Sequence, residues 1–255
     1  MNGLVAQLSA LSGLAEGMIW QVALVFLRVG GFVAMLPALG EQALPLRVKL
    51  AAAVAITLIV APGVEVAAGV APGPLGLIAE AVTGLALGFG LRLTVLGLQM
   101  AGTLAAQSLS LAQMFAGTGP EPAPIVANLL FLSGVALFLA MGGLARSVEL
   151  LLLSYQMIPA GGAPDPAALA SWGLGRVVRI FALSFALAAP FVLAALLYNL
   201  ALGAINRAMP TLMVSFIGAP ALTLGGLILL ALAAPLVLEV WQTAMERALA
   251  APFSG

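Results

Sequence analysis

The sequence predicts an all-α polytopic membrane protein with about six long apolar helices. Of its 255 residues, 63% are hydrophobic and 7% are charged, whereas a soluble domain is about 45–50% apolar and about 25% charged. The mean hydropathy is +1.20. No apolar segment alternates at period two, and alanine and leucine are abundant, so a transmembrane β-barrel is not expected. So few charges cannot cover a water-facing surface, which places the chain in the membrane class.

Six segments are long enough to span a bilayer core, which takes about 20 apolar residues. They cover approximately residues 18–39, 48–68, 75–98, 125–158, 174–202 and 212–241. Proline and glycine mark the connections between them. Pro37 and Pro45 bracket a short turn, while residues 62–74 and 161–166 are predicted to be loops. Residues 1–17 contain no Lys or Arg, so we expect no cleaved signal peptide there.

Two stretches do not fit a simple apolar span. Residues 125–158 are too many for one untilted span, and they include Gly142 and Gly143, with Arg146 and Glu149 following. We expect a hairpin or a break at the two glycines, with the charges near it. Residues 99–113 contain three Gln and two Ser, and we expect this helical piece to pack against protein rather than lipid.

The distribution of basic residues gives no consistent topology. Arg47 and Lys49 follow the first apolar segment and favour a cytoplasmic location for that connection. A simple six-span count then places Arg176 and Arg179 outside and Arg207 inside. Either residues 125–158 form a hairpin, or the chain does not insert as simple spans.

The rare residue types exclude several kinds of chemistry. The chain has no Cys and no His, and Asp165 and Lys49 are its only Asp and Lys. These counts exclude disulfides, thiolate zinc sites, Ser–His proteases and two-aspartate proteases. Nine basic and nine acidic residues leave no net charge, so we expect no nucleic-acid partner. We predict a protein that is not an enzyme and has no cofactor or metal.

Arg28 lies near the middle of the first apolar segment. A charge at mid-bilayer costs about 2.5–3.5 kcal/mol on insertion scales, so we expect a partner, either Glu80 or Glu41. The alternatives are a structural ion pair and a snorkelling side chain. An ion pathway would require several such residues in register, which the sequence does not offer.

Gly84 and Gly88 have the spacing that lets two membrane helices approach closely. This pattern fits tight packing within the chain and a face for a partner helix equally well.

Residues 114–124 contain two Gly and three Pro and cannot continue a helix. No Gly-Lys-Ser/Thr follows, so a nucleotide loop is excluded. This segment is either a surface loop or an irregular segment that lines or blocks a pore.

Three stretches together resemble the FliR family of flagellar export proteins. Residues 26–62 (FLRVGGFVAMLPALGEQALPLRVKL…) have the family's Arg in the first helix, a Pro, a short turn and a Pro-x-Arg-x-Lys start to the second helix. Residues 84–112 are similar to its third helix and the amphipathic piece after it. Residues 199–227 contain the most specific match, Asn-Arg-x-x-Pro followed by Ile-Gly-x-Pro. The resemblance covers nearly the whole chain, and implies one export-gate domain over residues 1–255.

The resemblance implies a component of the type III export gate in the bacterial inner membrane, at the flagellar basal body. Such proteins form helical hairpins in a hetero-oligomeric spiral with FliP-like and FliQ-like partners, together with an FlhB-like export switch protein. The closed helical pore passes unfolded flagellar subunits. The resemblance places a pore plug loop at Met114, Phe115, Ala116, Gly117, Thr118, Gly119, Pro120, Glu121 and Pro122. The assembly motifs that it implies are Arg28, Pro37, Pro45, Arg47, Gly84, Gly88, Asn206, Arg207, Pro210, Gly218 and Pro220.

Two alternatives remain open at this stage. A homologous gate protein of a virulence secretion system would differ only in its cargo. A small-molecule or ion transporter predicts inverted repeats and several intramembrane charges that converge on one site. The sequence shows no convincing repeat, and Arg28, Glu80, Arg92 and Glu239 lie on different segments.

Overall fold

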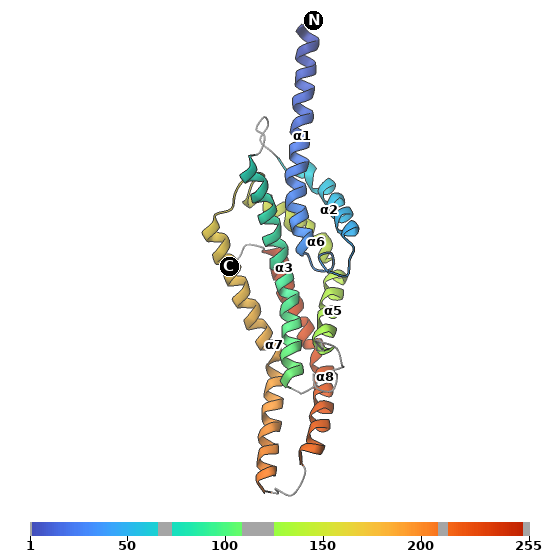
Figure 1. The fold of residues 1–255 in the computed structure, drawn as a ribbon, viewed down its shortest axis with the longest axis vertical. Helices are drawn as coiled ribbons and strands as arrows, with labels where there is room; N and C mark the ends of the chain where they lie inside the picture. The colour runs from blue at the N-terminus through green and yellow to red at the C-terminus, as the bar shows by residue number, and fades with distance from the viewer. Residues whose placement is uncertain (1, 66–72, 109–124, 209–213, 252–255) are drawn as a thin grey trace. The chain divides into compact units, whose positions relative to one another are not determined.

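Every regular element in the described part of the chain is helical, which confirms the all-α class (Figure 1). The computed structural model describes residues 2–65, 73–108, 125–208 and 214–251, without the side chains of residues 2–16, 206 and 214–223. The helices are α1 (Asn2–Met35), α2 (Leu46–Val60), the 3-10 helix η1 (Ala61–Gly63), α3 (Pro74–Ser108), α5 (Ile125–Ala140), α6 (Gly143–Met157), α7 (Pro166–Ala208) and α8 (Val214–Ala250).

The lengths and hydropathy of these helices are those of a polytopic membrane protein. Within the described residues, five helical stretches are long and apolar enough to cross a membrane. They are Gly17–Met35, Leu46–Gly63, Pro74–Ser108, Pro166–Ile205 and Leu224–Ala250. The bent pair α5 and α6 adds a sixth if it counts as one span. This agrees with the six apolar segments predicted from the sequence.

The helices differ from the predicted apolar segments mainly in being longer. The first helix begins at Asn2 rather than at residue 18, because residues 2–17 are rich in Leu and Ala, which favour helix. The third continues through the polar stretch to Ser108 in one piece. There Ala101 and Ala105 are buried, so this part of the stretch packs against protein as expected. The rest of it, residues 109–113, lies outside the described residues.

The long fourth segment is broken at its two glycines, as the sequence predicts. Helix α5 ends at Ala140 and α6 begins at Gly143. Gly142 lies between them at φ 73° and ψ 27°, a left-handed conformation that glycine adopts without steric cost. Arg146 and Glu149 are exposed on the first turns of α6, so the charges lie near the break.

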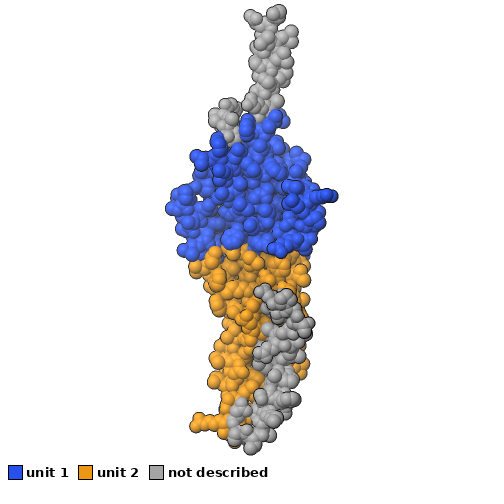
Figure 2. Space-filling view, in the orientation of Figure 1, with its two compact units in different colours: residues 1–92, 138–176, 247–255 blue, residues 93–137, 177–246 orange. Residues whose placement is uncertain are grey.

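The chain forms two compact units, coloured separately in Figure 2. Unit 1 contains residues 1–92, 138–176 and 247–255, and unit 2 contains residues 93–137 and 177–246. The core of unit 1 includes the buried side chains of Leu24, Val25, Val29 and Phe32 from α1, and of Leu36 directly after it. Their spacing of three and four residues gives α1 one apolar face toward this core.

Unit 2 is held by a buried tryptophan and a buried serine. Trp241 of α8 is fully buried, and its indole Nε1 donates a 2.8 Å hydrogen bond to the carbonyl oxygen of Thr94 in α3. Ser184 of α7 donates through Oγ to the carbonyl oxygen of Gly97 at 2.8 Å. A β-carbon on Gly97 would lie 2.6 Å from Cγ2 of Ile180. These contacts join α3, α7 and α8 at short range.

Candidate functional site

The most concentrated arrangement of polar groups in unit 1 is a buried ion pair between Arg28 of α1 and Glu80 of α3. The side chains of both residues have no exposed surface. Arg28 Nε lies 2.6 Å from Glu80 Oε2, and Arg28 Nη2 donates to Glu80 Oε1 at 3.1 Å. This two-bond geometry is the strong form of an arginine–carboxylate pair. Of the two partners that the sequence offered, Arg28 therefore pairs with Glu80.

Groups from α6 and from the segment after it complete the surroundings of the pair. Arg28 Nη1 donates to Ser154 Oγ at 3.1 Å, and Nη2 donates to the carbonyl oxygen of Ile158 at 3.0 Å. The backbone N–H of Gly161 donates to Glu80 Oε1 at 2.7 Å. One ion pair thus connects α1, α3, α6 and the start of the α6–α7 connection.

Tyr155 covers one side of the guanidinium group. The Cζ atom of Arg28 lies 3.7 Å from the centre of the Tyr155 ring, close enough for a cation–π interaction. The Tyr155 hydroxyl lies 3.5 Å from Glu80 Oε2, a long and weak hydrogen bond. The ring therefore contributes mainly through its face, and it excludes other groups from the arginine.

The chemistry of this network is structural. Both charges are neutralised by each other, and four of the five N–H groups of Arg28 have an acceptor. A buried pair satisfied in this way is tolerated, whereas removal of one partner typically costs about 3–5 kcal/mol. Its hydrogen bonds join α1, α3, α6 and the α6–α7 connection, so the network positions helices.

Glycines bring α1 and α3 close enough for this pair to form. A β-carbon on Gly84 would overlap the carbonyl oxygen of Arg28 itself. One on Gly88 would lie 2.5 Å from the carbonyl oxygen of Phe32, and one on Gly31 would lie 2.6 Å from that of Ala81. Of the two roles that the glycine spacing allowed, Gly84 and Gly88 thus serve packing within the chain.

The turn between α1 and α2 covers residues 36–45, between the two prolines that the sequence indicated. Pro37 is buried, and Ala38 follows it at φ 70°. Pro45 is the N-cap residue of α2, with φ −58° and ψ 144°; its ring fixes this φ. Arg47 lies on the first turn of α2 with its side chain exposed.

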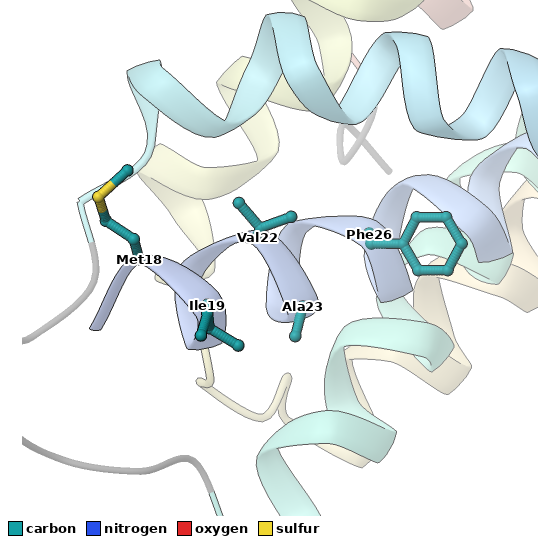
Figure 3. A pocket seen from close by; sticks show the side chains of 5 residues that line it. All are labelled: Met18, Ile19, Val22, Ala23 and Phe26. Carbon is teal, nitrogen blue, oxygen red and sulfur yellow. The ribbon is translucent and has the colours of Figure 1, made fainter. Parts of the chain in front are cut away.

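An apolar groove lies on α1, formed by Met18, Ile19, Val22, Ala23 and Phe26 (Figure 3). Its volume is about 440 Å³, and it is open rather than enclosed. Met18 and Ile19 are 66% and 68% exposed. The groove offers contact to lipid tails or apolar side chains but no hydrogen-bonding group.

The remaining predicted positions are only partly described. Arg207 is exposed on the last turn of α7, and Asn206 belongs to the same turn, without a described side chain. Gly218 and Pro220 fall within α8, also without described side chains. Pro210 and the predicted plug loop, residues 114–124, lie outside the described residues.

The sequence analysis missed the α6 side of the network. Ser154, Tyr155, the Ile158 carbonyl and the Gly161 amide are all contacts of the pair that the sequence did not indicate. Tyr155 was the one sequence indication of a polar contact on this side. The chain has only two tyrosines, and this one follows a serine in an apolar helix. Among the residues that the structure describes, no group of three acidic side chains could hold a metal ion.

Fold and site together define a helical, polytopic membrane protein whose interior charges hold helices together. Comparison with known proteins specifies it further: residues 19–248 match the family described as Bacterial export proteins, family 1, and the chain belongs to this family, that of the FliR proteins. It is 33% identical to the flagellar biosynthetic protein FliR of Caulobacter vibrioides over 230 residues, covering 88% of this chain and 92% of that protein. It is 31% identical to the Escherichia coli FliR over 221 residues, with 83% of each chain covered. The Aquifex aeolicus FliR is 31% identical over 160 residues, 62% of each chain.

Proposed function

We propose that the protein is a component of the flagellar type III export gate and forms, with FliP-like and FliQ-like membrane proteins, a closed helical pore for unfolded flagellar subunits. The observation that carries this proposal is membership of the FliR family over residues 19–248. The FliR family is one of export proteins, so the proposed role is transport rather than catalysis. The whole of residues 1–255 would act as one gate domain, in the inner membrane at the flagellar basal body.

Exposed apolar surface supports assembly with other helices. In unit 2, Leu197 of α7 and Leu232 of α8 are 67% and 75% exposed, and the polar stretch after Gln99 continues α3 with Gln107 exposed. A glutamine side chain is a poor neighbour for lipid tails and a good one for another protein helix. These surfaces suit FliP-like and FliQ-like companions, and an FlhB-like switch protein would join the same assembly.

The buried Arg28–Glu80 network would hold the helices of this subunit in a fixed arrangement. It fixes α1 against α3 and attaches the start of the α6–α7 connection to both through Ile158 and Gly161. A gate subunit needs such a fixed part, because neighbouring subunits can bind in one defined orientation only if the surfaces they contact do not move. Residues 114–124 would supply the complementary element, a plug that yields to the passing chain.

The experiment that tests the function is deletion of the gene in its own bacterium. We expect loss of swimming and of secreted flagellar subunits, with both restored by the gene on a plasmid. An affinity tag on the restored protein should co-purify FliP-like and FliQ-like proteins in a single complex. A deletion strain that swims and secretes normally would refute the proposed function.

Two other functions predict different phenotypes for the same deletion strain. A gate of a virulence secretion system would leave swimming intact and abolish secretion of effector proteins. A small-molecule transporter would leave both secretions intact and change the uptake of a solute. The transporter has little support in the described residues, because the mid-helix charges Arg28 and Glu80 are buried against each other rather than facing a cavity.

A further inference from the structure

A cavity of about 560 Å³ lies within unit 1, between η1 and α6. One wall consists of the end of η1 and the residues after it, up to Glu65. The other consists of α6 and the residues that follow it, including Pro159. The two walls come close at Gly63, where a β-carbon would lie 3.3 Å from Cδ2 of Leu152. The cavity is therefore a cleft between two segments that are far apart in the sequence.

Helix α1 holds both walls in place. Gln21 donates through Nε2 to the carbonyl oxygens of Ala61 and Val64, at 2.7 and 2.8 Å. Arg28 donates to the carbonyl oxygen of Ile158, at the start of the other wall, at 3.0 Å. Gln21 and Arg28 are seven residues apart, which is about two turns, so they lie on the same face of α1. Hydrogen bonds to one helix thus set the spacing of the walls, and a ligand would bind to a preformed cavity.

The lining combines aliphatic surface with two polar side chains. Leu152 and Pro159 are the aliphatic part, and Glu65 and Gln156, both exposed, add a carboxylate and an amide to the same cavity. Among the residues that the structure describes, neither of these two side chains forms a hydrogen bond or an ion pair. Glu65 is also the only charged residue in the lining. Both groups are therefore available to a ligand.

The charges around the cavity select a cation. Tyr155 lines the cavity and lies against the guanidinium group of Arg28, with 3.7 Å between Cζ and the ring centre. Arg28 is neutralised by Glu80, and both side chains are fully buried, so this pair adds no net charge beside the cavity. Glu65 consequently determines the sign, and a cationic group is its electrostatic complement.

The lining also specifies the shape of that cation. A carboxylate and an amide oxygen together can accept several N–H groups, which a planar guanidinium group offers in a fixed fork. The methylene groups of an arginine pack favourably on aliphatic surface while the charged end stays near water. An arginine side chain therefore matches the acceptors and the apolar walls at the same time.

We infer that this cavity binds an arginine side chain of another polypeptide. Glu65 and the side-chain oxygen of Gln156 accept hydrogen bonds from the guanidinium group, and the methylene groups lie against Leu152 and Pro159. The inference rests on the cavity itself and does not depend on the export function.

The test titrates the full chain in detergent micelles with the peptide acetyl-Ala-Arg-Ala-amide, and saturation-transfer NMR measures binding against empty micelles. We expect binding that weakens as the salt concentration rises, because the ion pair is accessible to solvent. Acetyl-Ala-Leu-Ala-amide, with an uncharged side chain, should bind more weakly. Agmatine, which carries the same guanidinium group and methylene groups without the peptide backbone, should displace the arginine peptide.

Two variants at exposed positions test the lining. Glu65→Gln should weaken binding of the arginine peptide about fivefold, the range of a solvent-accessible ion pair. Gln156→Trp should fill the cavity and abolish saturable binding. The matched control is Glu149→Gln, which removes one exposed carboxylate from α6 outside the lining and should leave binding unchanged.

Three results would overturn the inference. If the leucine peptide binds as tightly as the arginine peptide, the cavity selects apolar side chains. If Glu65→Gln and Glu149→Gln weaken binding equally, general charge explains the effect. If agmatine does not displace the arginine peptide, the peptide is held by its backbone and the arginine assignment is wrong.

Discussion

Gly84 of α3 faces the backbone carbonyl of Arg28 in α1 with no room for a β-carbon between them. The same arginine sends its side chain to Glu80, one turn earlier on α3. The close approach of the two backbones and the buried ion pair are therefore at one level of the helix pair. The distance between the helices that Gly84 permits is what lets a guanidinium group meet a carboxylate with two bonds.

Gly84→Ala should separate α1 from α3 and weaken the pair. A methyl group forced into a tight contact typically costs about 1–3 kcal/mol, and loosening of a buried ion pair adds to that. We expect a lower midpoint of thermal unfolding for the purified complex. The control is Gly30→Ala on α1, where a β-carbon meets nothing within 4 Å and alanine favours helix. Equal midpoints for the two variants would contradict the close-packing interpretation.

Arg28→Ala should destabilise the protein by about 3–5 kcal/mol, because it leaves Glu80 buried without its countercharge. Glu80→Ala should cost a similar amount for the converse reason. Arg28→Met combined with Glu80→Leu should cost less than either, since no unpaired charge remains. Unfolding of the complex gives the free energies of unfolding, and swimming measures the consequence in cells. Normal swimming with Arg28→Ala would mean that the arginine is dispensable.

Ala38→Gly should stabilise the turn between α1 and α2. Ala38 has φ 70°, and this left-handed region costs an L-residue roughly 1–2 kcal/mol compared with the right-handed one. Glycine avoids that cost but gives the unfolded chain more freedom, so we expect a net gain of at most about 1 kcal/mol. Ala43→Gly in the same turn is the control, because Ala43 has no positive φ and the change should be neutral or destabilising. Thermal unfolding measures both.

The helices were predictable from the sequence because apolar length and helix breakers determine them locally. Gly142 and Gly143 indicated the break between α5 and α6, and Pro37 and Pro45 indicated the turn. The helix ends were less predictable. Residues 2–17 and 99–108 continue α1 and α3 although they are less apolar than the segments beside them, since helix propensity does not require an apolar sequence.

The candidate site was predictable only in part, for a physical reason. A charge in an apolar helix demands a partner, so Arg28 pointed to a short list of carboxylates that contained Glu80. Nothing local requires Ser154 or the Ile158 carbonyl to meet that arginine, because these contacts arise from packing across more than 120 residues of chain. Contacts to backbone carbonyl oxygens in particular cannot be predicted from residue types, because every residue has such an oxygen.

We propose that residues 114–124 close the pore, and this segment supplies the last prediction. It lies outside the described residues, so its composition supports the proposal. Gly117 and Gly119 allow backbone conformations that other residues avoid, and Pro120, Pro122 and Pro124 deny the second half a regular helix.

Deletion of residues 116–118 should therefore let the assembled complex leak small ions across the membrane while export persists or falls only partly. Met114 and Phe115 would remain to make apolar contacts, but the shortened loop could no longer reach across the pore. Ion flux into vesicles that contain the purified complex measures the leak, and secreted flagellar subunits measure export. Deletion of residues 67–69, from the predicted loop between the second and third apolar segments, is the control and should leave the complex tight. If the 116–118 deletion assembles normally and is as tight as the parent, the loop is not a plug.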